Sequence, residues 1–378
     1  MDVSTRVVTA LRAVPIERSR LLPVDWLRGL VMVLMTIDHA SSSFNAGRLF
    51  GDTAQGWVLG TALPAAQFFT RWITHLCAPT FLFLAGYSLF ISVQRRKRDG
   101  ASEAEITRSI AARGLLVAAL DPLWMVFVHK GELVLQVLYA IGVSMMAMSV
   151  LRRLPARVCG ALGLLLVVLH EALARAFAHA EGAGRLLLVL TLVPGRAGPF
   201  PVSYPVIPWL AAMLLGWAAA DLARRDPEAF QRRLVVAGIV ALGVFAVVRG
   251  LSGYGNAGLF RDDGSLVQWL HTAKYPASLA YLACELGIAW LLLAALWTAD
   301  LPAPLRVPLT VLGQSAFFFY LLHAHLLRFA AWSTGLLRQS GLASTYLSAA
   351  VVIALLLPLC ARFRRYKMSH PESLARYI

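Results

Sequence analysis

Residues 24–40 read VDWLRGLVMVLMTIDHA, an apolar stretch that carries charged residues at both ends. Arg28 and His39 are eleven residues apart, about three turns of an α-helix at ~3.6 residues per turn. They therefore share one helix face, roughly 16 Å apart along the axis at ~1.5 Å per residue. Ionisable groups within a membrane helix cost about 2.5–3.5 kcal/mol each, so they face protein or water and mark a pathway or a site. This pattern predicts a helix that lines a polar channel, with His39 at its working end.

The composition is that of an integral membrane protein. Of 378 residues, 58% are hydrophobic and only 15% are charged, whereas a soluble domain of this length carries far more charge. The net charge of +15 would also suit nucleic acid, but the basic residues fall in short clusters between apolar runs, such as RRKR at 95–98. Such clusters are typical of cytoplasmic membrane loops, so we expect no nucleic-acid partner.

Two further features exclude other classes of protein. The cysteines are scattered singly in or beside apolar segments, at Cys77, Cys159, Cys284 and Cys360. They show no metal-ligand spacing, so we expect small buried side chains, no disulfide framework and no metal. The first 20 residues are rich in arginine and lack an apolar core, so we expect no cleavable signal.

The apolar runs predict an all-α, polytopic helical bundle. A spanning helix needs about 20 apolar residues. We therefore predict about ten spans, at residues 24–44, 66–93, 107–128, 132–151, 156–179, 203–224, 231–250, 276–299, 307–331 and 343–361. The run RLLLVLTLV at 185–193 is too short to span alone and is either re-entrant or part of an eleventh helix. The excess of Lys and Arg in alternate loops places both termini in the cytoplasm.

This pattern predicts a single transmembrane domain. It extends over residues 24–361, between a cytoplasmic N-terminal segment, 1–23, and a basic cytoplasmic tail, 362–378. The motif GYGNAG at 253–258 fits a dinucleotide-binding pattern, but it follows a membrane helix and not a strand, so we give it no weight.

His39 with Asp38 is the sharpest candidate for chemistry. An imidazole is suited to taking a proton from a hydroxyl or an amine, or to accepting an acyl group. Adjacent residues on a helix point about 100° apart, so a direct bond between the Asp38 and His39 side chains is not implied. The alternative is a pair at a helix end without chemistry.

Other polar residues in apolar segments are candidates for lining the same cavity or binding substrate. These are Arg71, His75, Arg113, Asp121, Lys274, Tyr275, Tyr320 and His323. His75 shares a helix face with Gly86, a residue that permits close helix packing. Arg113 and Asp121 are two turns apart and form either a structural ion pair or part of a binding site. Lys274 either extends to the membrane interface or binds an anion.

Six segments together resemble the relatives, in bacteria, of the catalytic domain of heparan-α-glucosaminide N-acetyltransferase. These segments are LRGLVMVLMTIDHA, RWITHLCAPTFLFLAGYS, LQVLYAIGVSMM, YPVIPWLAAMLLGW, TAKYPASLAYL and GQSAFFFYLLHAHLL. The resemblance extends from about residue 24 to residue 330, and the Arg28–His39 spacing is similar to the arginine–histidine motif of wider membrane O-acyltransferases. It implies an acyltransferase of the bacterial inner membrane. This enzyme is expected to move an acyl group, in particular acetyl, from cytoplasmic acyl-CoA to a hydroxyl or amine of a sugar on the outer side of the membrane.

The resemblance assigns roles to particular residues. Arg28 matches the arginine of the motif and is expected to bind acyl-CoA, while His39 and Asp38 match its histidine and the preceding acid and are expected to be catalytic. The lysosomal enzyme has asparagine at the position of His39 and its proposed catalytic histidine in the next loop. Here residues 41–74 contain no histidine, so His39 or His75 must supply that function. Asp121 stands where relatives usually have glutamate.

The resemblance also implies the partners: acyl-CoA, a carbohydrate or glycolipid acceptor and the lipid bilayer, with a homodimer left open. Two rival functions remain at this point. A transporter or channel for a small anionic or sugar-linked solute would use the same buried charges, although no inverted repeat is evident. The other rival is an accessory subunit without activity.

Overall fold

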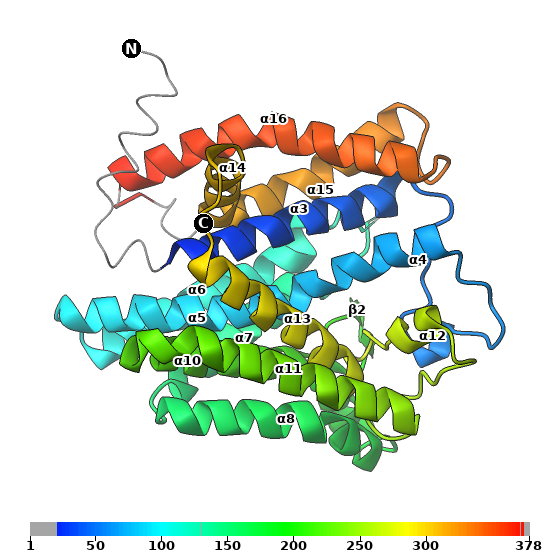
Figure 1. The fold of residues 1–378 in the computed structure, drawn as a ribbon, viewed down its shortest axis with the longest axis horizontal. Helices are drawn as coiled ribbons and strands as arrows, with labels where there is room; N and C mark the ends of the chain where they lie inside the picture. Colours follow the sequence, from blue (N-terminus) through cyan, green and yellow to red (C-terminus); the bar gives the residue numbers. More distant parts are fainter. Residues whose placement is uncertain (1–20, 130, 371, 374–378) are drawn as a thin grey trace.

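The computed structural model describes residues 21–129, 131–370 and 372–373. Most of the expected N-terminal segment and the end of the basic tail lie outside the described residues. The long helices run side by side along the long axis, with α16 and α8 at opposite edges and the short α14 lying crosswise beside α16 and α3 (Figure 1). The helices are α3 (Leu22–Phe44), α4 (Ala65–Trp72), α5 (Cys77–Arg98), α6 (Glu103–Trp124), α7 (Val137–Leu151), α8 (Ala156–Ala176), α9 (Gly182–Thr191), α10 (Val206–Arg225), α11 (Pro227–Leu251), α12 (Leu266–Leu270), α13 (Leu279–Thr298), α14 (Ala303–Gln314), α15 (Ala316–Ser333) and α16 (Leu342–Ser369).

The prediction of a helical membrane protein is confirmed, whereas the number of spans is not. Six stretches of the described chain are long and apolar enough to cross a membrane: residues 65–98, which comprise α4 and α5, and the helices α8, α10, α11, α13 and α16. The pair α14 and α15, bent by 91°, makes up to seven. About ten spans, an eleventh helix and cytoplasmic termini therefore stay predictions. The run at 185–193 falls mostly in α9, a helix of only ten residues, and a short hairpin of β1 (Gly195–Ala197) and β2 (Phe200–Val202) follows it.

Helix α3 is central to the fold because it packs against α14, α15, α16 and α5. Its contact with α14 depends on two glycines. A Cβ added at Gly29 would lie 2.2 Å from the backbone oxygen of Leu309, and one at Gly313 would lie 2.0 Å from that of Asp25. The expected span at 307–331 breaks just after Gly313, because α14 and α15 meet at a sharp bend. The bend leaves the Gly313 carbonyl without an intrahelical partner, and Arg28 donates to it at 3.1 Å.

Gly86 confirms the expectation of close helix packing. A Cβ there would lie 1.9 Å from the backbone oxygen of Met213 on α10, and one at Gly216 on α10 would lie 1.8 Å from that of Phe83 on α5. The two helices therefore touch backbone to backbone, as small residues allow in membrane proteins.

We expect Gly86→Ala to destabilise the fold by about 1–3 kcal/mol, the usual cost of overpacking a close contact. Gly243→Ala on α11 is the matched control, since a Cβ there meets nothing within 4 Å. It should leave stability unchanged or raise it slightly, because alanine favours a helix over glycine by about 0.5–1 kcal/mol. Thermal unfolding of the purified protein in detergent measures both variants. Equal melting temperatures for the two would contradict the packing argument.

Asp121 has a structural function that the sequence did not reveal. Its Oδ2 accepts the backbone N–H groups of Gln136 at 2.6 Å and Tyr139 at 2.8 Å. It thus caps the N-terminus of α7 from the neighbouring helix α6, where a negative charge is favoured. Of the two alternatives left open for Arg113 and Asp121, the structural ion pair does not form in the described structure, because this carboxylate faces α7 instead.

The expectation that the cysteines are small buried side chains is confirmed by the packing. All four cysteines are buried and free. The GYGNAG loop is held by Glu171 on α8, whose Oε2 accepts the N–H groups of Gly255 at 3.0 Å and Ala257 at 3.1 Å. Its glycines therefore serve a turn, since Gly255 has φ +90° and Gly258 has φ +80°.

Candidate functional site

A cavity of about 340 Å³ lies along α3 and extends from Arg28 to His39. This volume is at the lower end of the ~300–1,000 Å³ that small-molecule sites occupy. Its helical walls come from α3, α5, α6, α7, α14, α15 and α16. Six residues predicted from the sequence line it: Arg28, Asp38, His39, Arg113, Lys274 and Tyr320. The common helix face of Arg28 and His39 is therefore confirmed as a cavity wall.

His39 forms a pair with His323 on α15. The Nδ1 of His39 lies 2.7 Å from the Nε2 of His323, and the two rings are stacked with centroids 4.8 Å apart. The Nδ1 of His323 lies 3.0 Å from the backbone oxygen of Phe319. His323 does not itself line the cavity but lies behind His39, fully buried. The sequence-based expectation that it faces the cavity is wrong, because the His39 ring stands in between.

These contacts fix where the protons are on the two rings. A carbonyl oxygen only accepts, so the Nδ1 of His323 must carry the proton that it donates to Phe319. A neutral His323 then has an unprotonated Nε2, which accepts from the Nδ1–H of His39. The remaining nitrogen of His39, Nε2, carries a lone pair and has no hydrogen-bond partner among the described residues. His39 therefore presents a basic nitrogen from the cavity wall.

Asp38 does not contact the His39 ring. Its Oδ1 accepts from Arg48 at 2.9 Å, from Arg71 at 2.5 Å and from Thr74 at 3.0 Å, while Arg48 also donates to its backbone oxygen at 2.8 Å. The carboxylate thus anchors two arginines beside the cavity. A catalytic role for Asp38 stays a prediction.

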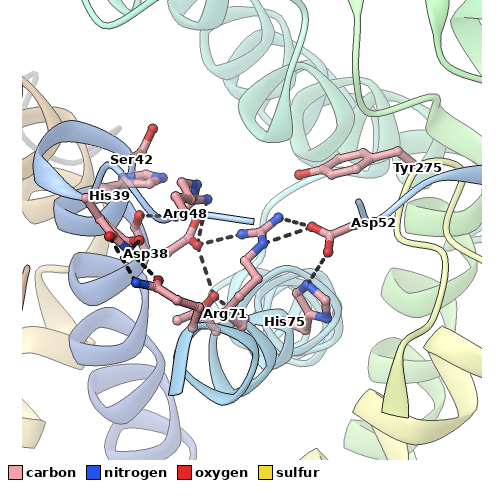
Figure 2. A network of polar contacts seen from close by, with 12 residues as sticks. Asp38, His39, Ser42, Arg48, Asp52, Arg71, His75 and Tyr275 are labelled. Atoms are coloured by element: carbon pink, nitrogen blue, oxygen red, sulfur yellow. Dashed lines mark hydrogen bonds and ion pairs between the residues drawn. The ribbon is translucent and has the colours of Figure 1, made fainter. Parts of the chain in front are cut away.

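Arg71 joins Asp38 on α3 to Asp52 in the loop that follows (Figure 2). Its Nε donates to Asp52 Oδ2 at 2.8 Å, and its Nη2 donates to the same oxygen. On the far side of Asp52, His75 Nε2 lies 3.4 Å from Oδ1. Burial would raise the pKa of Asp52, but Arg71 and His75 hold it well below its usual range. This network, made by Asp38, Arg48, Asp52, Arg71 and His75, is called the arginine–carboxylate cluster below.

The cluster places several predicted residues behind the cavity wall. Arg71 and His75 are buried but do not line the cavity, and neither does Tyr275. The Tyr275 hydroxyl lies 3.5 Å from that of Tyr204, which is in the wall. Lys274, next to Tyr275, does line the cavity, and its backbone N–H donates to the Asp52 carbonyl at 2.9 Å.

The opposite end of the cavity is basic. Arg28 donates to Asp25 at 2.8 Å and to Ser88 at 2.6 Å, so its position is fixed. Arg96, Arg113 and Lys367 line the same end. In the described part of the chain none of these three has a carboxylate partner. This end therefore carries an excess of positive charge that an anion can neutralise.

The model of one protein family matches this chain. It is described as heparan-alpha-glucosaminide N-acetyltransferase, catalytic, and it covers residues 20–248, more than half of the sequence. The chain belongs to this family. This family consists of membrane acetyltransferases. No curated protein matches the chain significantly.

The family match covers Arg28, Asp38 and His39 and ends before Lys274 and His323. The His39–His323 pair therefore joins the matched region to the remainder of the chain. Sequence reasoning missed Arg48 and Asp52, which carry half of the charges in the arginine–carboxylate cluster. The sequence feature that could have revealed them is a pair of opposite charges in the loop directly after α3, because loops often carry functional residues.

Proposed function

We propose that this protein transfers an acetyl group from acetyl-CoA to an amine or a hydroxyl of a sugar acceptor. One observation carries the proposal: a single cavity has unpaired cations at one end and the free Nε2 of His39 at the other. Arg28 at the basic end and His39 at the other end both lie on α3, roughly 16 Å apart at ~1.5 Å per residue. A donor with a phosphorylated head, a thin arm and a reactive thioester matches that distribution.

The basic end suits the phosphates of CoA. Guanidinium groups bind phosphate through paired, charge-assisted hydrogen bonds, and a lysine adds a mobile point charge. Arg113 and Lys367 come from α6 and α16, so a bound phosphate would link helices on two sides of the cavity. Arg28 is already paired with Asp25, so it contributes positive charge at the point where the thin arm of the donor leaves the basic end of the cavity.

The other end suits acid–base catalysis. The Nε2 of His39 takes the proton from the acceptor amine or hydroxyl while the acceptor atom bonds to the thioester carbon. The carbonyl π electrons move to oxygen, and they return as the C–S bond breaks. His39 then gives its proton to the departing CoA thiolate, so it ends in its starting form. His323 accepts from the Nδ1–H of His39 throughout and stabilises the transient imidazolium.

The proposal is tested with purified protein in lipid nanodiscs, acetyl-CoA labelled in the acetyl group, and glucosamine-terminated acceptors. We expect acceptor-dependent release of CoA in equal amount to acetylated acceptor. Release of one equivalent of CoA without acceptor would mark an acetyl-histidine route on the same Nε2. Absence of acetyl-CoA binding, or movement of a solute through proteoliposomes without any CoA release, would overturn the proposal in favour of transport.

The hydrogen bond from His39 to His323 leads to a prediction about two variants. His323→Gln retains an oxygen that can accept from His39 Nδ1–H, whereas His323→Leu does not. We expect the leucine variant to lose about tenfold in kcat, the effect of one hydrogen bond of ~1.4 kcal/mol. The glutamine variant should recover most of that loss, with KM for acetyl-CoA unchanged in both. Equal losses in the two variants would show that His323 contributes only packing.

A further inference from the structure

Lys274 is a buried cation that faces the cavity without a counter-ion. Only 4% of the residue is exposed, and its side chain lines the cavity together with His39. Among the described residues its Nζ has neither a hydrogen bond nor an ion pair. Its Nζ lies 5.5 Å from the centroid of the Tyr275 ring. A buried charge is costly unless it is paired or hydrogen-bonded, so an ammonium in this position indicates a site for a ligand oxygen that carries or develops negative charge.

The neighbouring carboxylates are not available to Lys274. Asp38 is held by Arg48 and Arg71, and Asp52 is held by Arg71 and lies beside His75. Two carboxylates therefore face two guanidinium groups. Glu285 on α13 is also buried, but no ion pair joins it to Lys274 among the described residues. Lys274 is linked through Asp52 and Arg71 to Asp38, the residue before His39, which places it at the His39 end of the cavity.

The position of Lys274 is fixed by the same cluster that surrounds His39. The Asp52 carbonyl accepts the backbone N–H groups of Lys274 at 2.9 Å and Tyr275 at 3.2 Å. The Asp52 carboxylate is bound to Arg71, and Arg71 is bound to Asp38, the residue before His39. The ammonium and the imidazole are thus held relative to each other by a continuous chain of contacts. Such preorganised charges act most strongly where negative charge develops in a reaction.

We propose that the Lys274 ammonium binds the thioester carbonyl oxygen of the acetyl donor and stabilises the negative charge that this oxygen acquires during transfer. The inference rests on the proposed acetyl transfer. As the acceptor atom bonds to the carbonyl carbon, the C=O π pair moves onto oxygen, opposite Lys274, while His39 takes the acceptor proton. When the pair returns, the C–S bond breaks and the thiolate receives that proton. No other reactant is needed.

An anionic group on the acceptor would also present a negatively charged oxygen to Lys274. Hydrolysis of acetyl-CoA by water in the absence of acceptor separates the two sources. Water attack also generates the carbonyl oxyanion, but it involves no acceptor. An effect of Lys274 on this slow hydrolysis therefore reports on the thioester oxygen alone.

The experiment compares wild type with Lys274→Met and Lys274→Arg in nanodiscs. We expect Lys274→Met to lower both kcat and the acceptor-free hydrolysis rate by about 10²–10³-fold, as loss of one oxyanion donor does. The Kd of acetyl-CoA, measured by titration calorimetry, should stay unchanged, and Lys274→Arg should recover part of both rates. Lys97→Met is the matched control, because Lys97 is exposed and paired with Glu103 outside the cavity, and it should retain both rates.

Each other outcome has a definite meaning. Wild-type rates in Lys274→Met would overturn the inference. Unchanged hydrolysis with a raised KM only for anionic acceptors would also overturn it and assign Lys274 to the acceptor. If Lys274→Met fails to fold, Lys274→Arg provides the test, provided that its melting temperature is that of wild type. Equal reductions in kcat and in the hydrolysis rate of this variant would support the inference. A wild-type hydrolysis rate would contradict the inference. A wild-type protein that neither binds nor turns over acetyl-CoA would instead remove the proposed function itself.

Discussion

Replacing His39 with glutamine is expected to lower kcat by about 10²–10⁴-fold, the usual contribution of a general base. Glutamine retains a polar side chain of similar length but has no nitrogen that can take a proton. Because we propose that the donor phosphates bind at the basic end of the cavity, away from His39, the Kd of acetyl-CoA should change little. The measurement is CoA release with a saturating acceptor, together with calorimetric titration of acetyl-CoA.

The matched control for this variant is His179→Gln, since His179 is exposed and lies outside the cavity wall. It should retain wild-type kcat. Wild-type turnover by His39→Gln would remove His39 from the mechanism and would leave the His39–His323 pair as a structural contact between α3 and α15. Loss of acetyl-CoA binding with unchanged kcat would place His39 in donor binding instead.

The second large effect is expected at the basic end of the cavity. A double variant, Arg113→Gln with Lys367→Gln, removes two cations that no carboxylate neutralises in the described structure. Charge-assisted hydrogen bonds contribute about 1.5–3 kcal/mol each, and every ~1.4 kcal/mol is tenfold in affinity. We therefore expect the Kd of acetyl-CoA to rise by about 100-fold or more, with kcat at saturation largely retained.

A donor without phosphates provides the internal control. S-acetyl-pantetheine should bind wild type and the double variant equally, because it lacks the phosphates that we propose Arg113 and Lys367 bind. Arg362→Gln on α16 is the matched protein control, since Arg362 is exposed and outside the cavity wall. An equal loss of affinity for both donors would mean that the two cations support the fold and do not bind phosphate.

The two predictions depend on features that differ in how readily the sequence reveals them. The separation of Arg28 and His39 is visible in the sequence, because a helix has a fixed repeat and rise. The helix face that His75 shares with Gly86 is visible in the sequence for the same reason. Cations of the basic end were harder to assign, since Arg113 and Lys367 are 254 positions apart in the numbering of the chain and meet only when α6 and α16 pack around one cavity.

The partner of His39 illustrates the limit most clearly. The sequence implied no direct bond between Asp38 and His39, because adjacent helical residues point in different directions, and Asp38 in fact binds Arg48 and Arg71. The residue that contacts the imidazole is His323, 284 positions away. Likewise, Asp121 caps α7 and does not pair with Arg113, because the backbone N–H groups at the start of α7 lie opposite its carboxylate.

Helical periodicity, apolar run length and charge placement established an all-helical membrane protein with a polar face on α3, because these properties depend only on residues near one another in the chain. Side-chain partners depend on which helices pack together and at what angle. The 91° bend between α14 and α15 and the close glycine contacts of α3 set that packing. They bring His323 behind His39, and only the folded arrangement gives the imidazole a defined proton position.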